Sequence, residues 1–235
     1  MNQTINFDKY ISQIITIQKY ARACLKRKCI LIPQSYYQTK AWRKTRTWYK
    51  GGKSNECEKY QIALIEKITG TILKKTHTRI NMETYGITST SRPMKNSDGY
   101  EYTENFDGLL IKGTNKYYYN LKFVCDAGGA QTRTLREVYH FIKCQMEYLI
   151  KFDANTINTN TNTNTINTNT NTNTNTNTNI NTYFINILDG DECFHNMDKF
   201  LYLLNKEQYK HIQKYVFIGS LYDFQKKGII NCING

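Results

Sequence analysis

The spacing of apolar residues predicts helices in four parts of the chain. In Phe7–Ile32, apolar side chains recur every three or four positions and basic side chains fill the opposite face, as in an amphipathic helix. A second helix is expected to begin after Ser54, a residue suited to the N-cap, and to end near Ile68. Two more are expected at Gln131–Ile150 and Asn196–Leu204.

Short apolar runs rich in aromatic and β-branched residues predict strands. The runs are Phe106–Lys112, Tyr117–Cys125, Tyr183–Leu188 and Tyr215–Ile218. Residues Gly113–Asn115 are expected to turn the first run back on the second as a hairpin. Thr71–Tyr85 also has strand-like residues without clear boundaries, whereas Gly86–Thr103 is expected to be a long polar loop. The alternation of helices and strands predicts an α/β fold with a central mixed sheet flanked by helices.

A tract of almost pure asparagine and threonine, Asn155–Thr182, interrupts this pattern. It has no charged or aromatic residue, so it cannot bury enough apolar surface to offset the entropy lost on ordering. We expect a disordered insertion there. The predicted domain organisation is therefore a basic helix at 1–33 and one domain formed by 34–154 and 183–235.

Composition and charge narrow the class of protein. The net charge of +13 favours nucleic acid, an anionic membrane or an acidic protein as partner. No apolar run approaches about 20 residues and the N-terminus lacks a signal-peptide pattern, so an intracellular protein outside the membrane is expected. The seven cysteines are scattered and the four histidines isolated, so neither disulfides nor zinc are expected.

The stretch Gln34–Lys53 interleaves tryptophan with basic residues. Trp42 and Trp48 alternate with Arg43 and Arg46, an arrangement typical of a surface that binds nucleic acid. The two tryptophans could equally anchor the segment to the core, with the basic residues facing solvent. The sequence leaves both interpretations open.

One group of residues suggests phosphodiester hydrolysis. Asn120 and Lys122 are two positions apart in a predicted strand and so share a face, and the hairpin brings Asp107 beside them. Glu58, on the preceding helix, could approach the same point. Carboxylates bind a divalent cation such as Mg²⁺, which polarises a phosphate, and a lysine can activate or orient the attacking water.

These residues resemble the motif of the PD-(D/E)XK, or restriction-endonuclease-like, superfamily. The resemblance rests on Asp107 in NFDG, on the NLK of Asn120–Lys122 and on Glu58, and the element order is similar to that superfamily's αβββαβ core. The runs KFVCDAGGAQTRTLREVYHFI, YFINILDGDE and FIGSLYDFQ further resemble type II restriction endonucleases of large DNA viruses. The similarity extends from Ser35 to the C-terminus, apart from the Asn/Thr tract.

The resemblance implies a Mg²⁺-dependent deoxyribonuclease that cuts double-stranded DNA at specific sequences, with Mn²⁺ as a possible substitute. It implies a homodimer if the site is palindromic, and the cytoplasm or nucleus of an infected cell as location. Asp107, Glu58 and Asn120 would hold the metal, and Lys122 would serve the nucleophile.

Asn120 departs from the pattern, because an acid usually stands two positions before the lysine. Three interpretations remain. Asn120 is a tolerated ligand without charge, or another acid, Glu58, Glu104 or Asp126, supplies the charge. In the third, the protein binds DNA without cutting it.

Two further segments suggest binding. Gln131, Arg133 and Arg136 open the helix after the lysine strand, where they could hold phosphates and read base edges. The alternative is an amphipathic helix whose arginines are solvated. The N-terminal stretch Ile17–Lys28 resembles an IQ motif, a helical target of calmodulin, although basic amphipathic helices are common.

Overall fold

The computed structural model describes residues 39–51, 55–161 and 182–227, all within the compact unit Gln34–Gly235. The expected helix at Phe7–Ile32, including its IQ-like motif, lies outside these residues, as do residues 162–181 of the Asn/Thr tract. In the part described, no helix is long and apolar enough to cross a membrane.

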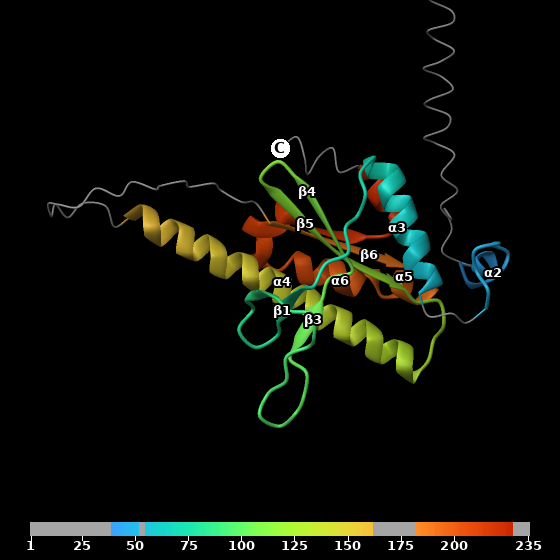
Figure 1. Ribbon diagram of the computed structural model, residues 1–235, viewed down its shortest axis with the longest axis horizontal. Coiled ribbons are helices and arrows are strands. Elements are labelled where there is room, and N and C mark those ends of the chain that lie inside the picture. The colour runs from blue at the N-terminus through green and yellow to red at the C-terminus, as the bar shows by residue number, and fades with distance from the viewer. Residues whose placement is uncertain (1–38, 52–54, 162–181, 228–235) are drawn as a thin grey trace, which may run out of the picture. The chain divides into compact units, whose positions relative to one another are not determined.

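A four-stranded mixed sheet forms the centre of the fold (Figure 1). Its strands, in spatial order, are β4 (Gly108–Lys112), β5 (Asn115–Phe123), β6 (Thr182–Asp189) and β7 (Val216–Gly219). β4 and β5 pair antiparallel as a hairpin, whereas β5–β6 and β6–β7 pair parallel. All four predicted strands and the predicted hairpin are confirmed.

Helices cover both faces of this sheet. Tyr118 and Tyr119 are neighbours in β5 and therefore point to opposite faces. Tyr118 lies near the rings of Phe106 and Phe184, on the face covered by α4 (Gly129–Thr161). Tyr119 contacts Phe224 of α7 (Leu221–Lys227), which packs beside α3 (Glu56–Thr69). In Figure 1, α4 and α3 accordingly lie on opposite sides of the sheet. The predicted α/β class with a central mixed sheet flanked by helices is confirmed.

The main hydrophobic core lies between α4 and the sheet. The ring of Phe106 is 5.0 Å from that of Phe141 on α4 and 5.6 Å from that of Phe184 on β6. α5 (Asp191–His195), α6 (Met197–Leu204) and the 3-10 helix η1 (Glu207–Tyr215) complete this layer. Every residue of β6 is buried, which explains why this central parallel strand reads as an almost continuous apolar run.

The region before the hairpin differs from the prediction. β1 (Thr78–Asn81), β2 (Ile87–Ser89) and β3 (Thr103–Asn105) form a second antiparallel sheet in the order β2-β1-β3. The expectation that Gly86–Thr103 is entirely loop is therefore wrong. These strands are three or four residues long and partly polar, so their alternation is too short to detect.

Two helix boundaries also differ. α4 ends at Thr161 rather than Ile150, and so includes residues 155–161 of the Asn/Thr tract. Once a helix has formed, each added residue gains a backbone hydrogen bond, so a helix can extend beyond its apolar stripe. α3 begins after Asn55, which makes no side-chain cap hydrogen bond; the expected cap Ser54 lies outside the described residues.

A close approach of two chain segments positions the start of β4. Lys74 forms an antiparallel bridge with Leu109, with N–O distances of 3.0 and 2.8 Å. A Cβ atom on Gly108 would lie 2.5 Å from Cγ of Leu73, so only glycine lets the two segments approach. The segment before β1 thus borders β4 directly beside Asp107.

Candidate active site

The carboxylate of Asp107 is attached to the edge of the hairpin. Asp107 precedes β4; its N–H donates to the carbonyl oxygen of Tyr119 at 2.8 Å, and its Oδ2 accepts from the N–H of Leu121 at 2.6 Å. No hydrogen bond from a described residue reaches Oδ1. The side chain is therefore held by the backbone of β5 while one of its oxygens stays available.

The surroundings of Asp107 disfavour its charge. Desolvation by burial is the main reason why its pKa is raised to about 6, and Glu58 and Glu104 raise the pKa further. Lys122 and the hydrogen bond from Leu121 act in the opposite direction. A carboxylate near two other acids and only one amine is a place where an added cation would be stabilised.

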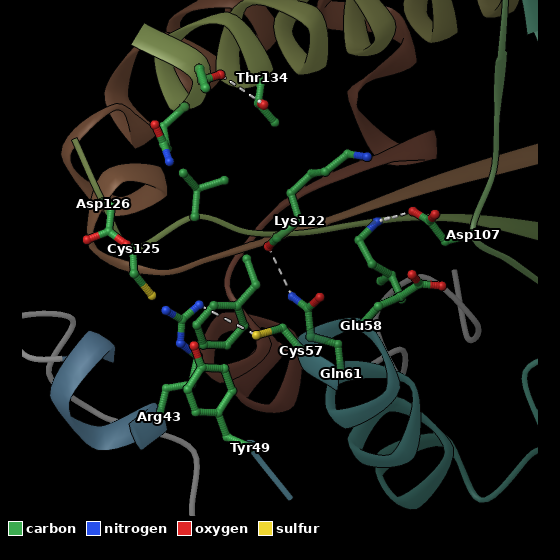
Figure 2. Close-up of a pocket in the computed structure, with 15 residues that line it drawn as sticks. Arg43, Tyr49, Cys57, Glu58, Gln61, Asp107, Lys122, Cys125, Asp126 and Thr134 are labelled. Carbon is green, nitrogen blue, oxygen red and sulfur yellow. Dashed lines mark hydrogen bonds between the residues drawn. The ribbon is translucent and has the colours of Figure 1, made fainter. Parts of the chain in front are cut away.

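Asp107 lies in a cleft of about 480 Å³ together with Glu58 and Lys122. Figure 2 shows Glu58 on α3 and Asp107 at the same end of the cleft, beyond Lys122. The complete lining is Arg43, Tyr49, Cys57, Glu58, Gln61, Asp107, Leu121, Lys122, Phe123, Val124, Cys125, Asp126, Ala130, Gln131 and Thr134. The structure thus brings together three of the four predicted catalytic residues.

Lys122 also lines a smaller neighbouring cavity on the α4 side of the sheet. Glu104 of β3 and Glu137 and Thr134 of α4 line that cavity with it. Desolvation raises the pKa of Glu104, while Lys122 lowers it. Glu104 is thus close to Lys122, and it is near enough to Asp107 to raise the pKa of that carboxyl.

Gln61 attaches α3 to the two central strands beneath the cleft. Its Nε2 donates to the carbonyl oxygen of Lys122 at 3.1 Å and to Oδ2 of Asp189 at 2.7 Å. Asp189 is buried, also accepts from the N–H of Leu221 at 3.0 Å, and has its pKa raised to about 6 by desolvation. These two hydrogen bonds fix α3 against the strands and so set the position of Glu58, which lies one turn earlier on α3. The sequence analysis missed both residues, although Asp189 ends a predicted buried strand.

Asn120 does not line the cleft. Its side chain is 1% exposed, and its Nδ2 donates to Oδ1 of Asn186 on β6 at 2.9 Å. Asn186 in turn donates to Oε1 of Gln145 on α4 at 2.8 Å and accepts from its Nε2 at 3.2 Å. The structure therefore places Asn120 in a buried network of amides, where its described contacts are structural rather than metal-binding.

The alternative acids differ in position. Glu58 and Glu104 both lie near Asp107, as their effects on its pKa show. Asp126 lies in the same cleft but forms an ion pair with Lys40, which lowers the pKa of Asp126. Glu58 and Glu104 are accordingly the better candidates for supplying the missing charge.

The residues expected to contact nucleic acid do not all lie in the cleft. Arg43 and Gln131 line the cleft. Arg46 stacks on Trp42 at 4.6 Å, outside the cleft. Arg133 and Arg136 are exposed on α4, and Arg136 lines a separate groove with residues of α5 and α6.

The tryptophans of the N-terminal segment pack against α3. Trp48 stacks on Tyr60 with ring centres 4.5 Å apart, and Trp42 meets the same ring at 5.4 Å. This packing fits the interpretation that they anchor α2 (Thr39–Lys44) and the residues after it. Lys44 and Lys50, two basic residues of the segment, are exposed.

No family model, curated protein or solved structure matches this chain.

The acids of the cleft suit a cation that needs few protein ligands. Among the described residues, no group of three or more His, Cys, Asp or Glu side chains is placed to hold a metal ion. Mg²⁺ commonly uses one or two carboxylates and completes its shell with water and substrate phosphates. Oδ1 of Asp107, with Glu58 or Glu104 nearby, provides donors of this type.

Proposed function

We propose that this protein is a Mg²⁺-dependent DNA endonuclease of the restriction type. The observation that carries the proposal is the single cleft in which Asp107, Glu58 and Lys122 meet. A partly desolvated carboxylate with a free oxygen, a second acid and an amine are the groups that metal-assisted hydrolysis of a phosphodiester requires.

The order of the elements supports the same proposal. α3 is followed by the Lys74 segment that borders β4 and by β1, β2 and β3 of the second sheet. Then come β4 and β5, the crossover helix α4, and β6 parallel to β5. The hairpin, crossover helix and parallel strand, in this order after a helix, support the resemblance to the αβββαβ core of the PD-(D/E)XK superfamily. Asp107 just before β4 and Lys122 near the end of β5 support the roles that the resemblance implies for them.

Each residue has a role in this proposal. Asp107 and Glu58 hold the metal, and Glu104 supplies the negative charge that Asn120 lacks. The bound cation would polarise the scissile phosphate and offset its developing charge. Lys122 orients the attacking water or neutralises charge on the phosphate oxygens. The net charge of +13 favours association with the DNA backbone.

The test is cleavage of long mixed-sequence DNA in Mg²⁺ or Mn²⁺ by wild type and by Asp107→Asn. The substitution keeps the shape of the side chain and removes its charge, so we expect cleavage to fall by about 100-fold or more. Asp98→Asn makes the same change on an exposed loop and should cleave like the wild type. Equal fragments from Asp107→Asn would refute the assignment.

A second candidate is a protein of the same fold that binds DNA without cutting it. The burial of Asn120 in the amide network favours it, because the usual second acid is then missing from the cleft. This candidate predicts DNA that is shifted on a gel but intact in both metals. Cleavage that depends on Asp107 would exclude it.

A further inference from the structure

The cleft that holds Asp107 has a second end with different chemistry. There the guanidinium carbon of Arg43 lies 4.7 Å from the ring centre of Tyr49 and 5.9 Å from that of Phe123. Figure 2 shows Arg43 and Tyr49 on one side of Gln61, with Glu58 and Asp107 on the other. Guanidinium and aromatic groups bind unpaired nucleic-acid bases, whereas the Asp107 end suits a phosphate.

Arg43 has unused hydrogen-bond donors. Its Nη1 reaches only the thiol of Cys57, a weak acceptor, at 3.7 Å, and its Nε has no hydrogen-bond partner among the described residues. It makes no ion pair with a described carboxylate, whereas Lys40 from the same helix pairs with Asp126. A half-buried guanidinium without a strong acceptor is costly, so acceptor atoms on a base would stabilise it.

The segment that carries Arg43 and Tyr49 is fixed at both ends. At its start, the N–H of Thr39 donates to Oδ1 of Asp191 at 3.2 Å, and the Thr39 hydroxyl donates to the same oxygen. At its end, the N–H of Lys50 donates to Oε2 of Glu56 at 2.7 Å. These hydrogen bonds therefore hold the segment in place along one side of the cleft.

The size of the cleft decides what it can hold. A volume of about 480 Å³ is typical of sites for small molecules, which span roughly 300–1,000 Å³. A cube of that volume has an edge of about 8 Å, whereas a B-DNA duplex is wider than its major groove, which alone is about 12 Å wide. A single nucleotide fits this space, and a paired duplex does not.

We propose that the cleft binds one unpaired nucleotide beside the scissile phosphate, with its base directed toward Arg43 and Tyr49. The substrate class is then DNA in which a nucleotide at the cut is already unpaired or becomes unpaired on binding. This inference rests on the proposed nuclease function, since it assigns the phosphate to the Asp107 end.

The test is equilibrium binding without metal, which does not depend on cleavage. Fluorescence anisotropy compares three labelled probes of one sequence: a fully paired duplex, the same duplex with a central mismatch, and the single strand. We expect the mismatched and single-stranded probes to bind at least about fivefold more tightly, because unpairing costs nothing there and base contacts are gained.

Variants of the cleft separate its chemistry from general charge. Arg43→Lys keeps the charge but loses the planar fork, and Tyr49→Ala loses the ring; each should reduce the preference for unpaired probes to less than about twofold. Tyr49→Phe keeps the ring and should retain the preference, as should Arg92→Lys, a matched change on an exposed loop. Thermal melts of each variant establish that it is folded.

The two proposals are decided by separate outcomes. Equal affinity for paired and unpaired probes, or a preference that survives both Arg43→Lys and Tyr49→Ala, overturns the unpaired-nucleotide inference alone. In that case the duplex lies across the mouth of the cleft. A protein that binds none of the probes also overturns the inference, whereas the nuclease proposal is decided by the cleavage test with Asp107→Asn.

Discussion

Replacing Asn120 by aspartate would introduce the acid usual in the PD-(D/E)XK motif that the chain resembles, and the structure predicts that it will harm the protein. Nδ2 of Asn120 donates to Oδ1 of Asn186, so an aspartate would set two oxygens against each other at this contact. Rotation of the Asn186 amide does not resolve the conflict. Its Nδ2 also donates to the carbonyl oxygen of Phe217 at 3.3 Å, and rotation would turn an oxygen toward that carbonyl.

The expected cost follows from burial. Asn120 is 1% exposed, and an uncompensated buried charge costs about 3–5 kcal/mol of unfolding free energy. For a chain of this size, about 1 kcal/mol changes Tm by roughly 2–4 °C, so Asn120→Asp should lower Tm by about 10 °C near pH 8. Asn120→Ala leaves Oδ1 of Asn186 its hydrogen bond from Gln145, and should cost only about 1–2 kcal/mol.

The pH dependence distinguishes a charge effect from a packing effect. Burial raises the folded-state pKa of the introduced aspartate above its unfolded value, so stability is lost as pH rises through the folded pKa. The difference in unfolding free energy between Asn120→Asp and the wild type should be small near about pH 4 and largest near about pH 8. Denaturant titrations at both pH values measure it. A variant that is as stable as the wild type at the higher pH and cleaves DNA faster would show that residue 120 faces the metal site.

Two further predictions concern Gly190 and Asp189, at the end of β6. Gly190→Ala should abolish the folded protein, because the backbone has φ of 99° and the new Cβ would lie 2.2 Å from the carbonyl oxygen of Val124. Gly99 has φ of 83° but open space around it, so Gly99→Ala should lower the unfolding free energy by only about 1–2 kcal/mol. Thermal melts compare the two. Asp189 has a folded pKa of about 6, so it contributes stability at low pH that is lost as pH rises from about 4 to about 6, by about 2–3 kcal/mol. Asp189→Asn should remove this part of the decline in denaturant titrations, and an unchanged pH profile would contradict the assigned burial.

The central sheet was predictable because its strands carry their own signals. β6 is buried along its whole length and reads as an apolar run, and the hairpin is marked by its Gly113 turn. The second sheet was not predictable, since β2 and β3 are only three residues long and β3 pairs with β1 across 22 to 26 residues of sequence. The length of α4 was not predictable either, because Asn/Thr residues favour no helix by themselves.

The sequence predicted which types of residue form the candidate site, but only in part where their side chains lie. The hairpin brings Asp107 to β5, and the spacing of two correctly places Asn120 and Lys122 on one face of that strand. Spacing along a strand does not show which side chains a neighbouring strand and helix will cover. Asn186 and Gln145, both distant in sequence, take Asn120 into the core and leave Lys122 at the cleft.

The role of Lys122 gives the most direct measurement of the central claim. Wild type and Lys122→Met are mixed with long mixed-sequence DNA and Mg²⁺, alongside Lys112→Met, the same change at an exposed position of the same hairpin. Cleavage by the wild type and by Lys112→Met, with none by folded Lys122→Met, is the result we predict. Cleavage that survives in Lys122→Met, or that is absent from the wild type in both Mg²⁺ and Mn²⁺, would contradict a nuclease site in this cleft.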